Sequence, residues 1–237
     1  EEIGNNYSLP ITDDRLPITD YPLPFHFCYL LPAGEAILQD WETVWDKYKI
    51  SPSPVTFKWK IGISPIETEI KLFWQLIQQL PSAIKLRLDA NGGLSLKNAK
   101  EWLKATDEVD KVEFVEQPLS PQQFDTMLEL SANHSTPLAL DESVATLKQL
   151  EDCYQKGWRG IFVIKPAIAG SPKRLRQFFQ QHQIDAVFSS VLETKIGQEA
   201  ALRLAKELSY PHRALGFGIE HLFKEEKDNW LENLWAH

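Results

Sequence analysis

The sequence predicts an α/β fold in which strands and helices alternate to form a (β/α)₈-type barrel. Three observations predict it. The chain has 237 residues with 43% hydrophobic content, a common size for a single α/β barrel domain. Eight short apolar or β-branched runs follow turn signals, and helix-like segments with apolar residues three and four apart separate them. A doubly wound open sheet is the structural alternative for the same alternation.

The expected elements cover most of the chain. Ser or Thr residues at Ser95, Ser120 and Thr146 support the helix boundaries, because such side chains cap the free amide groups of a first helical turn. The expected strands lie in residues 26–33, 56–62, 84–92, 111–119, 137–143, 160–170, 184–193 and 213–218. The expected helices lie in residues 66–80, 96–105, 121–131, 146–157, 171–182 and 197–209.

The two ends of the chain differ from this alternating part. Residues 1–27 are rich in proline and repeat LPITD, a pattern that predicts an extended arm or a remnant and excludes a coiled coil. Residues 224–237 are expected to form a helical or irregular tail. The barrel domain is therefore expected to span residues 28–223.

The composition argues against several classes of protein. The formal net charge is −8, and Lys and Arg are scattered, which argues against binding to nucleic acid or to an anionic membrane. Cys28 and Cys153 lie far apart and show no metal-ligand spacing, which fits a reducing cytoplasm. The sequence contains no apolar run long enough to span a membrane and no secretory signal pattern. A small acidic substrate remains compatible with this charge.

Two lysines stand in an otherwise apolar strand, TFKWKIG. Residues two apart point to the same side of a strand, so Lys58 and Lys60 share one face, and Phe57, Trp59 and Ile61 share the other. An unpartnered ammonium is costly to bury and tends to lose its proton, as a catalytic base near neutral pH requires. An edge strand with a solvated lysine face is the alternative explanation.

Charged residues end five successive strands, about one β/α unit apart. A closed barrel has no edge strands, so these side chains are expected to meet at the C-terminal end of the barrel, where barrel enzymes build their sites. For any single acid, a strand-end cap or a salt bridge is the more common role. The five residues are Lys60, Asp89, Glu116, Asp141 and Lys165.

The three acids of this set are the predicted metal ligands. Converging carboxylates without cysteine or histidine favour a hard divalent cation, Mg²⁺ before Mn²⁺ or Ca²⁺. Asp89, Glu116 and Asp141 would hold the cation. Lys60 and Lys165 would approach a bound substrate from opposite sides, which fits the removal of a proton next to a carboxylate.

Two more residues are expected to face the barrel interior. Lys58 should lie one layer below Lys60 and favour the neutral form of that lysine by like-charge repulsion. Arg87 precedes Asp89 by two positions and should share its inward face. We expect a carboxylate or several carbonyls around Arg87, because a guanidinium keeps its charge in proteins.

The motifs resemble those of the enolase superfamily, in its muconate-lactonizing-enzyme-like branch, and within it those of the o-succinylbenzoate synthases. The resemblance lies in the KxK strand of FKWKIG, the acids of LRLDAN, VEQP and LDES, and the later lysine of VIKPA, which occur in this order. LLPAGEA and SSVLE are similar to the synthase family in particular. This resemblance implies a TIM-like (β/α) barrel.

The resemblance also implies an activity. The family consists of Mg²⁺-dependent carbon–oxygen lyases that dehydrate 2-succinyl-6-hydroxy-2,4-cyclohexadiene-1-carboxylate to o-succinylbenzoate in menaquinone or phylloquinone biosynthesis. By this resemblance, Lys60 removes the α-proton and then protonates the departing hydroxide, while Lys165 stabilises the enediolate as an ammonium. The resemblance implies substrate or second-layer contacts for Lys58, Asn91, Glu142, Ser189 and Ser190.

Two alternatives stay open. Muconate cycloisomerases, N-acylamino acid racemases and dipeptide epimerases share both lysines, although the run RALGFG lacks the acids that dipeptide epimerases present on their eighth strand. Members of the superfamily also carry an N-terminal α+β domain that caps the barrel. We expect this domain to be largely absent here, because only the proline-rich arm precedes His26. An inactive barrel fragment is therefore the second alternative, and the sequence predicts no oligomeric state.

Overall fold

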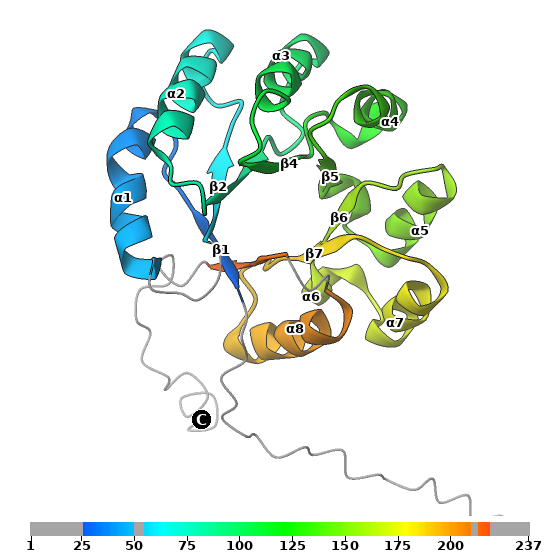
Figure 1. Cartoon of the computed structure of the whole chain (residues 1–237). Coiled ribbons are helices and arrows are strands. Elements are labelled where there is room, and N and C mark those ends of the chain that lie inside the picture. Colours follow the sequence, from blue (N-terminus) through cyan, green and yellow to red (C-terminus); the bar gives the residue numbers. More distant parts are fainter. Residues whose placement is uncertain (1–25, 50–54, 210–212, 219–237) are drawn as a thin grey trace, which may run out of the picture.

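Eight parallel strands form a nearly closed barrel in the computed structural model, which describes residues 26–49, 55–209 and 213–218 (Figure 1). The strand order is β7-β6-β5-β4-β3-β2-β1-β8. An isolated parallel bridge between Ser189 and Gly216 joins β7 to β8. The strands are β1 (Phe27–Leu30), β2 (Thr56–Lys60), β3 (Lys85–Asp89), β4 (Val112–Glu116), β5 (Leu138–Leu140), β6 (Ile161–Ile164), β7 (Ala186–Phe188) and β8 (Leu215–Gly218).

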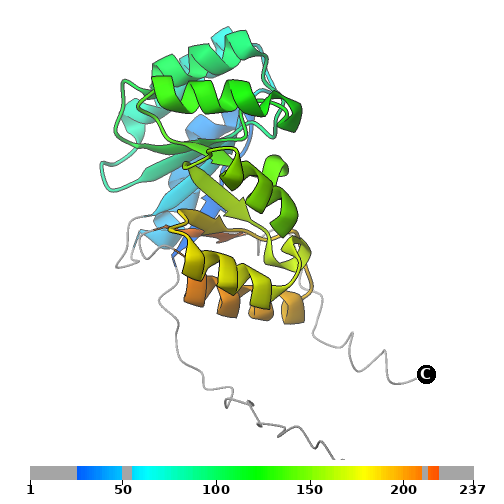
Figure 2. The same cartoon turned by 90° about the vertical axis from the view of Figure 1, so that its right-hand side faces the viewer.

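Helices surround this barrel on the outside, as the two views at right angles show (Figures 1 and 2). They are α1 (Ile37–Tyr48), α2 (Ile66–Gln79), α3 (Leu96–Thr106), α4 (Phe124–Asn133), α5 (Leu147–Gln155), α6 (Pro166–Ala169), α7 (Pro172–Gln181) and α8 (Lys195–Leu208). The predicted barrel is thus confirmed, and an open doubly wound sheet is excluded because the Ser189–Gly216 bridge joins β7 and β8, the two end strands of this order.

Each of the eight expected strand runs contains a strand, and each of the six expected helical segments contains a helix. Helix α1 was not among the expected helices. Its apolar residues recur three and four apart: Ile37 and Trp41 are buried, and Leu38, Val44, Trp45 and Tyr48 pack partly buried against the core. The sequence therefore carried the signal for this helix.

Two of the three expected helix caps form as expected. Ser95 accepts a hydrogen bond from the backbone of Asn98, and Thr146 forms a capping box with Gln149. Ser120 instead precedes a 3₁₀ turn and donates its hydroxyl to the side chain of Gln123, at 3.3 Å. This position therefore starts a turn without a side-chain cap on the backbone.

The apolar core has two layers. The larger one lies between strands and helices, where Trp102 of α3 packs edge-on against Trp59 and Phe73. The smaller one fills the barrel interior with Phe114, Ala139, Ile161, Val163 and Val187. Strand residues alternate between these two layers, as the period of two requires.

The lower end of the barrel, where the strands begin, carries a charged network that we call the floor. Arg87 is fully buried, donates from Nε to Glu113 at 2.7 Å and lies over the ring of Phe114. Arg213 contacts Glu113 at 2.7 Å and Asp185 at 2.5 Å. The predicted inward position of Arg87 and its carboxylate partner are confirmed.

A register shift explains how Glu113 reaches the floor. Val112 pairs with Leu86 and Phe114 with Arg87, so Glu113 is an extra residue in β4. A bulge of this kind turns a side chain that alternation alone would direct outward. Sequence periodicity could not show it, because the shift depends on pairing with β3.

Within the described part of the chain, no helix combines the length and the apolar character needed to cross a bilayer. The tail expected in residues 224–237 lies outside the described residues, and so does the proline-rich arm, except for its last two residues. Both assignments stay predictions.

Candidate active site at the barrel mouth

The five charged residues predicted from strand spacing do lie at one end of the barrel, which we call the mouth. Lys60, Asp89 and Glu116 are the last residues of β2, β3 and β4 and stand side by side in the strand pairing. Asp141 and Lys165 directly follow β5 and β6. Since all strands are parallel, these five residues share one end of the sheet.

The carboxylates at the mouth are deeply buried. Asp89, Glu116 and Asp141 are exposed by 2%, 1% and 3%. Buried carboxylates need partners, because an isolated charge loses its hydration in the protein interior.

Lysine ammonium groups provide these partners. Lys58 Nζ lies 2.7 Å from both carboxylate oxygens of Glu116 and 3.1 Å from Asp89 Oδ2. Lys60 Nζ donates to the same Asp89 oxygen at 2.8 Å. Lys58 is the more buried lysine, with 16% of its side chain exposed against 35% for Lys60, as expected if it lies one layer deeper.

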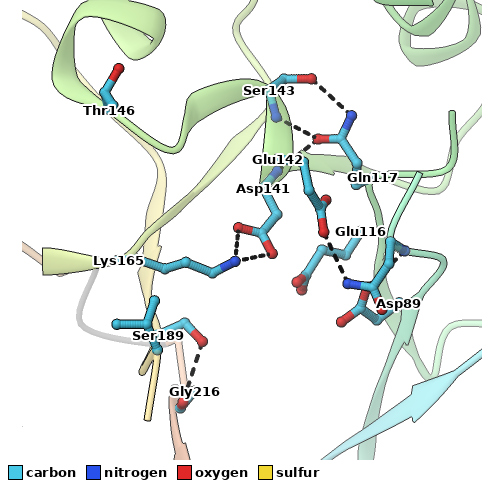
Figure 3. A network of polar contacts seen from close by, with 12 residues as sticks. Asp89, Glu116, Gln117, Asp141, Glu142, Ser143, Thr146, Lys165, Ser189 and Gly216 are labelled. Carbon is cyan, nitrogen blue, oxygen red and sulfur yellow. Dashed lines mark hydrogen bonds and ion pairs between the residues drawn. The ribbon is translucent and has the colours of Figure 1, made fainter. Parts of the chain in front are cut away.

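On the opposite side of the mouth, Lys165 extends toward Asp141 (Figure 3). Its Nζ lies 2.6 Å from Oδ1 and 2.7 Å from Oδ2. Lys60 and Lys165 therefore come from strands on either side of the three acids, in the arrangement that their spacing predicted.

The pKa values of the acids diverge. Burial raises the pKa of Glu116 to about 7, with a further contribution from Asp89 and against the opposing effect of Lys58. Burial also raises the pKa of Asp141 despite its contact with Lys165. Burial would raise the pKa of Asp89 too, but Lys58 and Lys60 outweigh it and lower that pKa. Carboxyl groups with such divergent environments are typical of functional sites.

Lys58 is a charged partner of carboxylates. Burial alone would lower its pKa, but Glu116 and Asp89 outweigh burial and raise it. Lys58 therefore holds two strand-end acids together, a contact that spacing in the sequence could not reveal. Its expected repulsive effect on Lys60 stays a prediction.

Asn91 links both sides of the mouth. Its Oδ1 accepts a hydrogen bond from Lys60, and its Nδ2 donates to Glu142 Oε1 at 3.0 Å. Its backbone φ is +45°, and its amide donates to Asp89 Oδ1 at 3.1 Å. The structure thus brings to the mouth three of the five residues expected to make substrate or second-layer contacts, Lys58, Asn91 and Glu142.

The two serines after β7 lie apart from these contacts. Ser189 donates to Gly216 O at 3.3 Å, across the closing seam of the barrel (Figure 3). Ser190 donates to Glu193 at 3.0 Å and accepts from the amide of Leu192 at 2.9 Å. Ser190 is thus engaged within its own loop.

Sequence reasoning missed Gln117 and Ser143. Gln117 follows Glu116 directly, is fully buried and bonds to Ser143 and to the backbone around Asp141. The signal in the sequence was an amide residue within VEQP, next to a predicted ligand.

The donor chemistry of the three acids suits a hard cation, because all donors are carboxylate oxygens. Within residues 26–49, 55–209 and 213–218, however, no three acidic, histidine or cysteine side chains form a metal-coordinating group. The ammonium of Lys58 lies between Asp89 and Glu116, where it neutralises both. By the chemistry of their donor atoms and by their burial, the three acids fit a cation, although in this arrangement they do not form a coordinating group.

Comparison with known proteins places the chain in a family. The family described as enolase C-terminal domain-like matches residues 53–231, and the chain belongs to this family. It is 38% identical over 212 residues to an o-succinylbenzoate synthase of Thermosynechococcus vestitus, covering 87% of this chain and 63% of that protein. It is 29% identical over 154 residues to an L-Ala-D/L-Glu epimerase of Bacillus subtilis, covering 63% of this chain and 42% of that protein.

A solved structure agrees with this placement. The o-succinylbenzoate synthase of Thermosynechococcus elongatus BP-1, described as complexed with Mg in the active site, superposes with a TM-score of 0.80. It is 35% identical to this chain, and the match covers 94% of this chain and 69% of that structure. The chain thus spans less than two thirds of the length of the Thermosynechococcus vestitus relative and under half that of the epimerase.

Proposed function

We propose that this chain is the barrel of an o-succinylbenzoate synthase, a lyase that removes water from 2-succinyl-6-hydroxy-2,4-cyclohexadiene-1-carboxylate. The observation that carries this proposal is the placement of Lys60 and Lys165 on opposite sides of three buried carboxylates. The similarity to the Thermosynechococcus synthase supports it over other lysine-dependent relatives. The product would serve menaquinone or phylloquinone biosynthesis in the cytoplasm.

Asp89, Glu116 and Asp141 would hold Mg²⁺, with Mn²⁺ as a possible substitute. When bound, the cation would supply positive charge beside the substrate carboxylate and so favour loss of the neighbouring proton. Lys60 would accept that proton at Nζ and return it to the departing hydroxide, which leaves as water. Lys165 would keep its ammonium proton and stabilise the negative charge that develops on the substrate.

The remaining residues would position these groups. Asn91 would orient the Lys60 amine through its Oδ1 and remain connected to Glu142. Lys58 would hold the Asp89 and Glu116 side chains at a fixed separation. Ser189 and Ser190 would line the substrate side of the β7–α8 loop. Residues 28–223 would form the catalytic domain, with the arm and tail outside it.

A second candidate is another lysine-based activity, such as epimerisation or racemisation, because the epimerase relative covers much of the barrel. Of the residues described around β8, 213–218, none is acidic, which disfavours a substrate with a free amine. A barrel without activity is the remaining alternative.

An absorbance assay tests the proposal directly. Aromatisation of the diene should appear with Mg²⁺ and disappear with EDTA. Conversion of an N-succinylamino acid without any dehydration would instead favour a racemase. No turnover of either substrate, in a protein that binds Mg²⁺, would favour the inactive barrel.

The cation has a separate test. Millimolar Mg²⁺ should raise the melting temperature, because a ligand that binds only the folded state stabilises it by mass action. Asp141→Asn should reduce this increase, since it removes one charged ligand. A melting temperature that does not respond to Mg²⁺ in the parent protein would contradict the proposed metal site.

A further inference from the structure

Gln117 has an unusual backbone conformation next to the mouth carboxylates. Its φ is +38°, in the left-handed region, which costs a residue with a β-carbon about 1–2 kcal/mol. Two backbone hydrogen bonds hold it there: its amide donates to Ala139 O at 2.8 Å, and its carbonyl accepts from Gly92 N at 2.7 Å. Such outliers persist where the surroundings fix them and cluster at functional sites.

The side chain of Gln117 uses its full bonding capacity, and Figure 3 shows its contacts with Asp141 and Ser143. Its Oε1 accepts from the backbone amides of Asp141 at 2.9 Å and Ser143 at 3.2 Å. Its Nε2 donates to Ser143 Oγ at 2.8 Å and to Leu119 O at 2.9 Å. A carboxamide has two donor hydrogens and two acceptor lone pairs. Because two backbone amides require an acceptor, the orientation of this group is fixed.

These bonds continue the connection between β4 and β5 beyond the end of their strand pairing. The last paired residues are Glu116 and Ala139. Two residues after Ala139, the backbone amide of Asp141 donates a hydrogen bond to the Gln117 side chain instead of to the backbone of a neighbouring strand. Gln117 thus joins the residue next to Glu116 directly to the backbone that carries the Asp141 carboxylate.

We propose that Gln117 is a positioning residue that sets the separation between the Glu116 and Asp141 carboxylates and so the affinity of the mouth for Mg²⁺. This inference rests on the proposed function, in which both acids are ligands. A buried glutamine with a purely structural role would affect stability alone. A positioning residue affects cation affinity in protein that remains folded.

Calorimetric titration of the full chain with Mg²⁺ separates the two roles. Gln117→Leu removes every side-chain hydrogen bond while keeping the volume similar, and it should raise the Mg²⁺ dissociation constant at least tenfold, as is typical when a residue that orients a ligand is lost. Gln117→Glu keeps an oxygen facing the two amides, so its dissociation constant should rise no more than threefold. Hydrogen exchange at the Asp141 and Ser143 amides should quicken in Gln117→Leu only.

Ser143→Ala and Asp107→Asn are the matched controls. Ser143→Ala removes one partner of Nε2 but keeps the Asp141 contact, and Asp107→Asn weakens hydrogen bonds at the floor end of the barrel. Both should lower the unfolding midpoint with less than a threefold change in Mg²⁺ affinity.

Three outcomes would overturn the proposal. Gln117→Leu could bind Mg²⁺ as tightly as the parent while losing stability, which would show a structural role. If Gln117→Leu does not fold, weak binding by the folded Gln117→Glu variant would refute the role of Oε1. A parent protein that binds no Mg²⁺ would instead remove the proposed metal site itself, so the two failures can be told apart.

Discussion

The floor and the mouth of the barrel both bury charged groups, but they pair them differently. At the floor, the cations are Arg87 and Arg213, and they share the carboxylate of Glu113. At the mouth, the cations that meet Asp89 and Glu116 are lysines. An arginine keeps its proton under all ordinary conditions, whereas a lysine can release one when its surroundings change.

This difference in cation suits a structural network at the floor and, under the proposed function, a chemical one at the mouth. Arginine at the floor gives a fixed charge with planar, directional bonds, which suits a permanent link between β3, β4 and β8. Lysine at the mouth gives a compact charge with three rotatable donors, and under the proposed function it would exchange a proton with the substrate. Substitutions at the mouth should therefore lower activity more than stability, and substitutions at the floor should lower stability more than activity.

Lys60→Ala should abolish turnover while leaving the fold and Mg²⁺ binding largely intact. A general base contributes roughly a hundred- to ten-thousand-fold to the rate, and the loss should be at least of this size. Steady-state rates from the aromatisation assay and a thermal melt of the same sample would measure both effects.

Lys58→Ala is the control from the same strand. Lys58 lies one layer deeper than Lys60 and is not expected to reach the substrate. Lys58→Ala should therefore reduce turnover less than Lys60→Ala. A dead Lys58→Ala enzyme beside an active Lys60→Ala enzyme would reverse the two roles.

Glu113→Leu should have the opposite profile, with a large loss of stability. It leaves Arg87 fully buried without its ion-pair partner, and breaking a buried pair in this way costs about 3–5 kcal/mol. Urea unfolding would measure the change in the free energy of unfolding. The folded fraction should keep the kcat of the parent.

The double variant Arg87→Met/Glu113→Leu sharpens this test. Replacing both partners by apolar side chains removes the unpaired charge, so it should recover part of the lost stability. A double variant less stable than Glu113→Leu would show that the floor depends on Arg87 for more than this pair, such as its contact with the Phe114 ring.

Lys58→Met should lower the free energy of unfolding by less than Glu113→Leu does. We expect a loss of about 2 kcal/mol in the absence of divalent cations, which is within the usual range for an unsatisfied buried group. The loss is smaller because Glu116, whose pKa is already raised to about 7, can take up a proton in place of the lost ammonium. Millimolar Mg²⁺ should restore most of this stability, but none of that lost in Glu113→Leu. Unfolding with and without Mg²⁺ would measure it, and equal recovery in both variants would contradict a cation site confined to the mouth.

The smallest effect is expected at Asp107, at the floor end of α3. Hydrogen bonds from His134, Ser135 and Thr136 outweigh burial and lower its pKa to about 2. A lowered pKa means that this contribution to stability is complete above about pH 4 and is lost as the pH falls toward 2. Asp107→Asn should lower stability at neutral pH by about 1–2 kcal/mol.

The acid profile provides the control. The difference between Asp107→Asn and the parent should shrink between about pH 4 and pH 2, because protonation weakens the same bonds in the parent. A difference that stays constant across this range would show that the Asp107 charge does not contribute.

Periodicity in the sequence was enough to predict most of the barrel. Alternation located all eight strands, and the two-residue period placed Arg87 and Asp89 on one inward face. Charges at equivalent strand ends predicted which residues meet at the mouth. All these inferences need only local geometry and one assumption, that the sheet closes.

Features that depend on pairing between strands could not be predicted. Glu113 reaches the floor only through a register shift against β3, and Gln117 reaches Asp141 only because its backbone turns left-handed. The choice of Lys58 as the partner of Glu116 also depends on side-chain reach across three strands. Such contacts are set by tertiary structure, on which a single chain segment carries little information.

The pairing of β1 with β8 has a consequence for biosynthesis. The first and last strands of the barrel become neighbours, so the ring cannot close until residues 215–218 have left the ribosome. Until then, the growing chain exposes two unpaired sheet edges, at β1 and at the most recent strand, and such edges promote association between chains. Closure across so long a stretch of sequence is also slow. The arrival of the final strand is therefore the step that removes both exposed edges of the sheet.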